Sequence, residues 1–290
     1  MVTLRVKSEK LLGRRLIYLS ILLAVTIPMI WRISFKERAS SMVRDVFTAI
    51  ESLPPGARVL VVYDFDPGTE PEIKPMADAF TRHLCLKGAK LYWATLWPTG
   101  PVQIDKTIRD VLKPEFPDYR YGVDYVNLGY VSGNEGVIAL ALTDFRKAFV
   151  TDAHNIPTSD SERLPIMQLA RNIRSFNLIV DCSGGYPGLQ EWIQYAAVPG
   201  RVTLLGGSVA VGTPELFPYV PEQCLGFLAG IKGAAEYEQL LLERYPQLDR
   251  PQCRVALERM GPQTVAHLAI IFFILLGNGL HLLRRGREES

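Results

Sequence analysis

An uncharged apolar stretch near the C-terminus, residues 264–283 (TVAHLAIIFFILLGNGLHLL), most constrains what this chain can fold into. It runs for 20 residues, and its polar members His267, Asn278 and His281 lie near its two ends. An α-helix of about 20 apolar residues crosses the hydrocarbon core of a bilayer. A buried helix of a soluble domain would carry a polar stripe, which this stretch lacks. We therefore expect a transmembrane helix over 264–283, followed by a basic tail over 284–290.

A second apolar stretch lies near the N-terminus, where residues 16–31 read LIYLSILLAVTIPMIW. It carries no charge, and it reaches about 20 residues if Arg32 turns its guanidinium back to the headgroups. Trp31 suits the membrane interface. A cleaved signal peptide is the alternative, but bulky residues (WRISFKER) stand where small ones should mark the cleavage site. We expect a transmembrane helix over 16–35, preceded by a basic tail over 1–15.

The charges of the two short tails indicate an orientation in the membrane. Both tails are basic, and short basic flanks stay in the cytoplasm. We therefore expect both termini in the cytoplasm and the domain between the helices on the extracytoplasmic side of a cell membrane. The domain side of the N-terminal apolar stretch also carries basic residues, which makes the difference in charge between the two sides of the membrane smaller. These residues are Arg32, Lys36, Arg38 and Arg44.

The cysteines give a second, weaker indication of the compartment. There are four, Cys85, Cys182, Cys224 and Cys253, an even number that is compatible with an oxidising compartment. Cys182 lies in an apolar run and reads as a small buried hydrophobe. Cys224 with Cys253 is the one pair that we consider for a disulfide. None of the spacings is that of a metal site.

The part between the apolar stretches, residues 36–262, has about the size of one α/β domain. Residues 33–262 hold 23 Lys and Arg against 27 Asp and Glu, a net charge of −4. A nucleic-acid partner needs a clustered basic face, which this domain lacks, so we expect no nucleic-acid binding. No motif identifies a cofactor.

Short apolar runs alternate with amphipathic stretches along this domain. Alternation without hairpin signals predicts an α/β fold, a doubly wound and mostly parallel sheet of five or six strands. The polar stretch 150–164 predicts a long surface loop. The expected strands are 58–65, 89–96, 124–131, 177–182 and 201–205, and the expected helices are 36–53, 73–88, 103–112, 137–149, 165–174, 189–197 and 222–245.

Ligands of open parallel sheets bind at the carboxyl ends of the strands, and here the loops after the strands are rich in glycine and acid. Glycines at a helix start let backbone amides approach an anion, although they also serve plain tight turns. No GxGxxG or GxxxxGK[ST] motif is present. The residues of this candidate site are Asp64, Asp66, Gly133, Asn134, Glu135, Asp181, Ser183, Gly184, Gly185, Gly207 and Ser208.

Nucleophilic catalysis has little support in the sequence. His83 falls within an expected helix and His154 in the long polar loop, and no GxSxG elbow is present. The aromatic residues Tyr92, Trp93 and Trp97, in and after the second strand, are either core or a surface on which a ligand stacks.

Two patterns resemble known families. Asp64 and Asp66 at a strand end resemble the aspartate motif of haloacid-dehalogenase hydrolases, which implies magnesium and a nucleophilic aspartate. Thr69, however, falls three residues after Asp66, where that family has two. Asp66 in DPGT otherwise caps a turn. The segments YGVDYVNLGYVSGNEGV, DCSGGYPGLQEWIQY, GTPELFPY and GIKGAAEYE resemble an uncharacterised prokaryotic family of membrane-anchored α/β proteins. A looser fold-level likeness is to the lobes of type I periplasmic binding proteins.

Three functions stay open at this point. The first is a non-catalytic binding or scaffold subunit held beside membrane-protein partners. The second is a sensor domain that binds a small ligand or an anion. The third is a metal-dependent hydrolase that uses Asp64 and Asp66.

Overall fold

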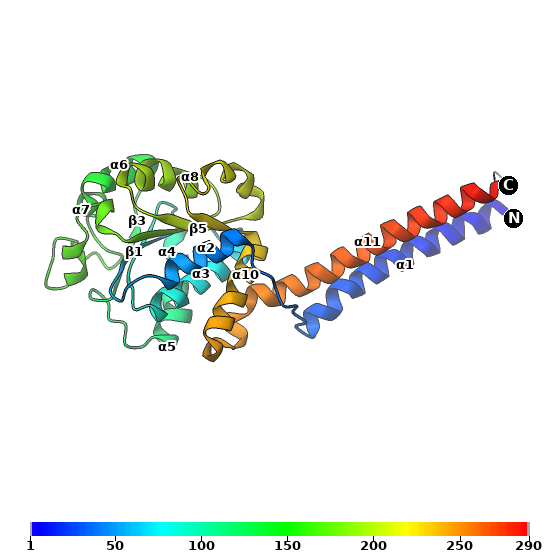
Figure 1. Cartoon of the computed structure of the whole chain (residues 1–290), viewed down its shortest axis with the longest axis horizontal. Helices are drawn as coiled ribbons and strands as arrows, with labels where there is room; N and C mark the ends of the chain where they lie inside the picture. The colour runs from blue at the N-terminus through cyan, green and yellow to red at the C-terminus, as the bar shows by residue number, and fades with distance from the viewer. Residues whose placement is uncertain (1, 289–290) are drawn as a thin grey trace. The chain divides into compact units, whose positions relative to one another are not determined.

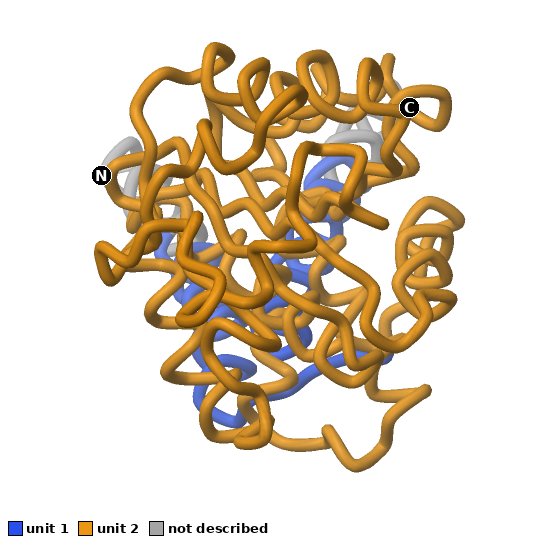
Figure 2. Tube along the Cα trace, turned by 90° about the vertical axis from the view of Figure 1, so that its left-hand side faces the viewer, with its two compact units in different colours: residues 1–36, 257–290 blue, residues 37–256 orange. Residues whose placement is uncertain are grey.

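The computed structural model describes residues 2–288, and the chain divides into two compact units (Figure 2). One unit holds residues 1–36 and 257–290, and the other holds residues 37–256. The second unit is the α/β domain, and its bounds lie close to the 36–262 expected from the sequence.

The first unit is built from two long helices, α1 (Val2–Ile30) and most of α11 (Val255–Glu288), which run antiparallel (Figure 1). In α1, Ile21, Ala24 and Pro28 are wholly or partly buried at helical spacing. In α11, Ala266 and Ala269 are partly buried in the same way. Most other described apolar side chains of both helices are exposed.

One helix of the described chain is long and apolar enough to cross a membrane, the segment Val255–Gly279 of α11. In an apolar stretch of 18 residues within this segment, only 11% is buried, whereas the core helix of a soluble protein is mostly buried. The apolar part of α1, Arg15–Ile30, is shorter than such a span because charged residues precede it. We expected a membrane span at each end of the chain. By length and apolar composition, only the C-terminal helix of the described chain qualifies.

The domain contains one six-stranded sheet, in the order β3-β2-β1-β4-β5-β6, in which every neighbouring pair is parallel. The predicted doubly wound α/β fold is confirmed, and the sheet is wholly rather than mostly parallel. The strands are β1 (Arg58–Asp64), β2 (Lys90–Thr95), β3 (Tyr125–Tyr130), β4 (Leu178–Ser183), β5 (Leu204–Ser208) and β6 (Gly226–Ala229).

Helices cover both faces of this sheet (Figure 1). On one face α3 packs against β4, β5 and α10. The Tyr63 hydroxyl of β1 donates a hydrogen bond to the backbone oxygen of Ala77 in α3 at 3.1 Å. On the other face α6 and α8 pack over Leu60, Val62 and Ile179. The larger helices are α2 (Ser41–Glu51), α3 (Glu70–Leu86), α4 (Gly100–Thr107), α6 (Asn134–Thr143) and α10 (Gly230–Arg244), with shorter α5 (Lys113–Glu115), α7 (Phe145–Ala148), α8 (Leu189–Trp192) and α9 (Val198–Gly200).

The structure corrects three predicted elements. Strand β6 lies inside the predicted helix 222–245. The sequence did not predict this strand because four residues are too few to show an alternating pattern. The predicted helix 165–174 is a pair of 3₁₀ turns, Pro165–Leu169 and Ile173–Ser175. The fifth strand begins at Leu204, three residues later than predicted.

The cysteines also differ from the prediction in part. All four are buried free thiols, so the Cys224–Cys253 disulfide is wrong. Cys224 packs in the core cluster over the sheet, whereas Cys253 lies near Arg82 and Glu115. Cys182 is fully buried in β4, as predicted.

Glycines in β5 permit the closest packing around the sheet. A Cβ on Gly206 would lie 1.9 Å from the backbone oxygen of Asp181 in β4, and one on Gly207 would lie 2.0 Å from Sδ of Met76 in α3. Gly207 is therefore a packing residue inside the strand, not part of a loop after it. The prediction that the fifth strand ends at residue 205, before Gly207, is therefore wrong.

The substitution Gly206→Ala should lower the free energy of unfolding by at least about 2 kcal/mol, because the methyl group meets backbone that cannot move aside. Gly136→Ala is the matched control, since a Cβ there meets nothing within 4 Å and alanine favours the exposed start of α6. Urea denaturation of the two variants measures the difference. Equal stability of both would show that β5 does not need a glycine.

Candidate functional site

The candidate site lies at the carboxyl ends of β1 and β4, where the strand order reverses and open α/β sheets bind ligands. Asp64, the last residue of β1, is fully buried there. Its Oδ1 accepts hydrogen bonds from Leu96 N at 2.6 Å and Thr95 Oγ1 at 3.2 Å. Its Oδ2 accepts one from Trp192 Nε1 at 3.1 Å. Burial nevertheless raises the pKa of Asp64 to about 7.

Asp181 is the second buried carboxyl group and lies one strand away. In the register of the sheet it stands opposite Val62, two residues before Asp64 in β1. Neither of its oxygens has a hydrogen-bond partner of normal geometry within the described part of the chain. Burial raises the pKa of Asp181 well above its usual range, and the Asp64 carboxylate raises it further. Burial and the neighbouring charge therefore favour the protonated form of Asp181.

Asp66 does not join Asp64. Its Oδ1 accepts hydrogen bonds from N and Oγ1 of Thr69, both at 2.9 Å, and so caps the turn that leads into α3. These bonds from Thr69 lower the pKa of the Asp66 carboxyl group. Among residues 2–288, no group of three His, Cys, Asp or Glu is placed to hold a metal ion.

The loops after β1, β2 and β4 are fastened to one another. Gly184 N donates a hydrogen bond to Asp64 O at 2.8 Å, and Trp97 Nε1 donates one to Pro187 O at 2.7 Å. A Cβ on Gly184 would lie 2.6 Å from Oγ1 of Thr69, so glycine is required for this approach. These contacts join the three loops at the crevice between β1 and β4. Trp97 thus holds a loop in place, a role that the sequence did not indicate.

The loop after β3 is placed beside the loop after β4. Gly133 and Asn134 have positive φ angles of 135° and 46°, which turn the chain into α6. The Tyr186 hydroxyl donates a short hydrogen bond to Glu135, and this bond lowers the pKa of the Glu135 carboxyl group. The two predicted glycine-rich segments are therefore neighbours.

A pocket of about 290 Å³ opens between the carboxyl ends of β4 and β5, and we call it the β4–β5 pocket. It contains four residues predicted from the sequence, Ser183, Gly184, Gly185 and Ser208. The sequence reading did not single out its acidic residues. The pocket is also lined by Tyr186, Leu189, Gln190, Glu191, Val209, Gly212, Glu215 and Leu216.

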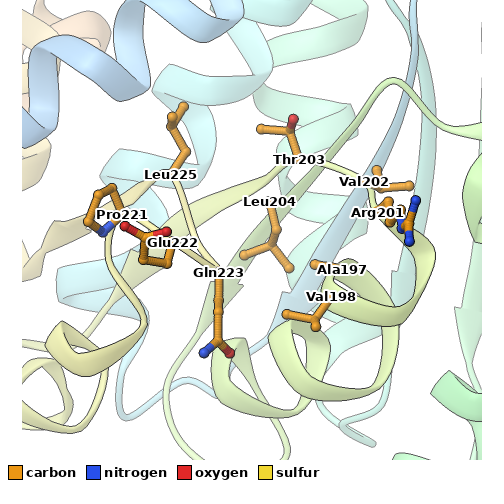
Figure 3. A pocket seen from close by; sticks show the side chains of 10 residues that line it. All are labelled: Ala197, Val198, Arg201, Val202, Thr203, Leu204, Pro221, Glu222, Gln223 and Leu225. Carbon is orange, nitrogen blue, oxygen red and sulfur yellow. The ribbon is translucent and has the colours of Figure 1, made fainter.

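Two further pockets, each of about 400 Å³, lie elsewhere on the domain. One is at the amino end of β5, where Arg201 lies on one side, Glu222 on the other and Leu204 between them (Figure 3). The other follows β3 and includes Asp152, whose Oδ2 accepts a hydrogen bond from the Tyr121 hydroxyl at 2.6 Å. Neither contains a residue of the predicted site.

The histidines take part in packing. His83 is fully buried, with Nε2 2.9 Å from Glu51 Oε2 and Nδ1 2.6 Å from the Tyr237 hydroxyl. Burial lowers the pKa of His83 to about 4. The His154 ring packs edge-on against Tyr121 at 4.8 Å between ring centroids. Tyr92 and Trp93 are buried core residues.

The sequence was compared with models of protein families and with curated proteins. No family model and no curated protein matches this chain.

The buried pair predicts how stability changes with pH. Folding raises the pKa of these carboxyl groups above the unfolded value of about 4. Such a group stabilises the fold fully below its unfolded pKa, and this contribution is lost as the pH rises through its pKa in the folded protein. Asp181→Asn removes one such group and its effect on Asp64. Wild-type protein should therefore lose more thermal stability than Asp181→Asn between pH 5 and 7, by on the order of 5 °C. His83 contributes to the pH dependence equally in both proteins. Parallel melting curves for the two proteins would contradict the expectation.

Proposed function

We propose that this protein is a membrane-anchored α/β domain that acts as a non-catalytic binding or scaffold subunit beside membrane-protein partners. Both α1 and α11 cross the bilayer in this proposal, and the domain lies between them in sequence. The proposal has two parts, the anchoring and the binding role, and different observations support them.

The exposed apolar surface of the helix pair supports two spans. Leu22 of α1 is 60% exposed and Leu275 of α11 is 67% exposed, and both belong to long runs of exposed apolar side chains. Surfaces of this kind require lipid or a partner. Because the two helices run together, a bilayer around α11 also surrounds α1. Arg15 and Arg32 at the ends of the shorter stretch reach the headgroups through their apolar stems.

The antiparallel arrangement bears on orientation. It brings the basic N-terminal and C-terminal tails to the same side of a bilayer, and the positive-inside rule makes that side the cytoplasm. The α/β domain then lies on the extracytoplasmic side.

The contacts of Asp64 and Asp66 at the β1–β4 crevice are the reason why we propose a binding role and not catalysis. The oxygens of Asp64 and Asp66 accept hydrogen bonds from separate parts of the chain, so they do not converge on a shared metal or substrate. The hydrolase alternative therefore has less support. The β4–β5 pocket favours a second candidate function, a sensor domain for a small ligand.

Labelling of single cysteines tests the orientation. Ser161→Cys, in an exposed loop of the domain, should react with a membrane-impermeant maleimide on intact cells. Ser290→Cys should react only after permeabilisation. The buried native cysteines make the wild-type protein a suitable blank. Labelling of both sites on intact cells, or of neither, would contradict two spans with cytoplasmic ends.

Purification of the full-length chain in mild detergent tests the binding role. We expect membrane proteins to co-purify in stoichiometric amounts, as measured by mass spectrometry, and Asp66→Asn to leave this association unchanged. A protein that purifies alone but is stabilised by a small ligand would favour the sensor. Magnesium-dependent turnover that Asp66→Asn abolishes would establish the hydrolase instead.

A further inference from the structure

The charged side chains that line the β4–β5 pocket are all acidic. Glu191 of α8 and Glu215, after β5, both line it, and no Lys, Arg or His is among the lining residues. Gly188 N donates a hydrogen bond to Glu191 Oε2 at 2.8 Å. This bond fixes the side chain and leaves carboxylate lone pairs for a ligand. Such walls attract a cation and repel an anion.

A buried carboxyl group lies behind this pocket. Asp181 is two residues before Ser183 in β4, so both side chains project from the same face of the sheet, and Ser183 lines the pocket. Asp181 is fully buried, and in the described chain neither of its oxygens has a hydrogen-bond partner of normal geometry, although the Ser183 hydroxyl is near enough to favour its carboxylate. Glu191 is close enough to disfavour that carboxylate. An unpaired buried polar group is unfavourable, so a positive charge bound nearby stabilises the carboxylate of Asp181.

The remaining walls favour an organic ligand over a bare metal ion. Leu189, Val209 and Leu216 supply apolar surface, and Tyr186, 61% exposed, presents an aromatic ring. Aromatic faces attract organic cations. Metal ions need several converging oxygen ligands, and only two carboxylates line the pocket. The volume of about 290 Å³ lies at the lower end for ligand sites and suits a small molecule.

We infer that the β4–β5 pocket binds a small organic cation, an amine or quaternary ammonium group attached to a short apolar portion. Glu191 and Glu215 hold the charged group, and the leucines and valine contact the apolar portion. This inference rests on the second candidate function, the small-ligand sensor, and deepens it by naming the class of ligand. It departs from the anion that the glycine-rich loops first indicated.

Titration calorimetry of the full-length chain in an uncharged detergent tests the inference, with choline and putrescine as probes and inorganic phosphate at equal ionic strength as the anion. We expect a probe cation to bind and phosphate not to bind. Glu191→Gln keeps an acceptor for Gly188 N while removing the charge, and Glu215→Gln removes the other charge. Each should weaken cation binding about tenfold or more.

The matched control is Glu222→Gln, which makes the same charge change at the amino-end pocket and should bind as the wild type does. Asp181→Asn should also weaken cation binding. Wild-type affinity in that variant would overturn the part assigned to Asp181. Preferential phosphate binding, an equal loss in Glu222→Gln, or no cation binding up to ~10 mM would overturn the inference as a whole. Stoichiometric partners in the purification experiment would still support the binding subunit if no cation bound. Failure of both experiments would remove both proposals.

Discussion

The carboxylate of Asp64 is the interaction on which the arrangement of the site depends. It stands at the end of a central strand and accepts hydrogen bonds from the β2 loop, through Leu96 N, and from α8, through Trp192. A fully buried carboxyl group is stable only with such donors. Its position therefore fixes the neighbouring loops, and the Gly184 amide adds a third connection through the Asp64 backbone oxygen. These hydrogen bonds join the loops at the crevice where sheets of this order bind ligands.

The β4–β5 pocket lies one strand along the sheet from that crevice. It is lined by residues of the loop after β4, which also contacts Asp64 and Trp97. Acidic groups around a small, partly apolar space favour a ligand of opposite charge, which is the basis of the cation proposed for this pocket. This is why a binding role fits the geometry better than hydrolysis by Asp64 and Asp66.

Anchoring depends on a separate physical constraint, the exposure of apolar side chains. The side chains of α11 would be buried in a soluble core but are mostly exposed here. Partial burial of Ile21 and Ala24 at helical spacing shows that α1 uses one narrow face for packing and leaves the rest outward. This exposure is the basis for the proposal that lipid surrounds both helices.

The sequence by itself determined the fold class, because buried parallel strands are continuous apolar runs whose order along the chain limits the topology. It also determined the C-terminal apolar helix and most of the residues at the sheet edge. Strand β6 was missed because its four residues carry no periodic signal. Only the tertiary structure decided that Asp64 and Asp66 point to different partners, that Gly207 packs against Met76, and that Glu191 and Glu215 face one pocket. Those facts depend on side-chain directions and on contacts between distant segments, which local sequence patterns do not encode.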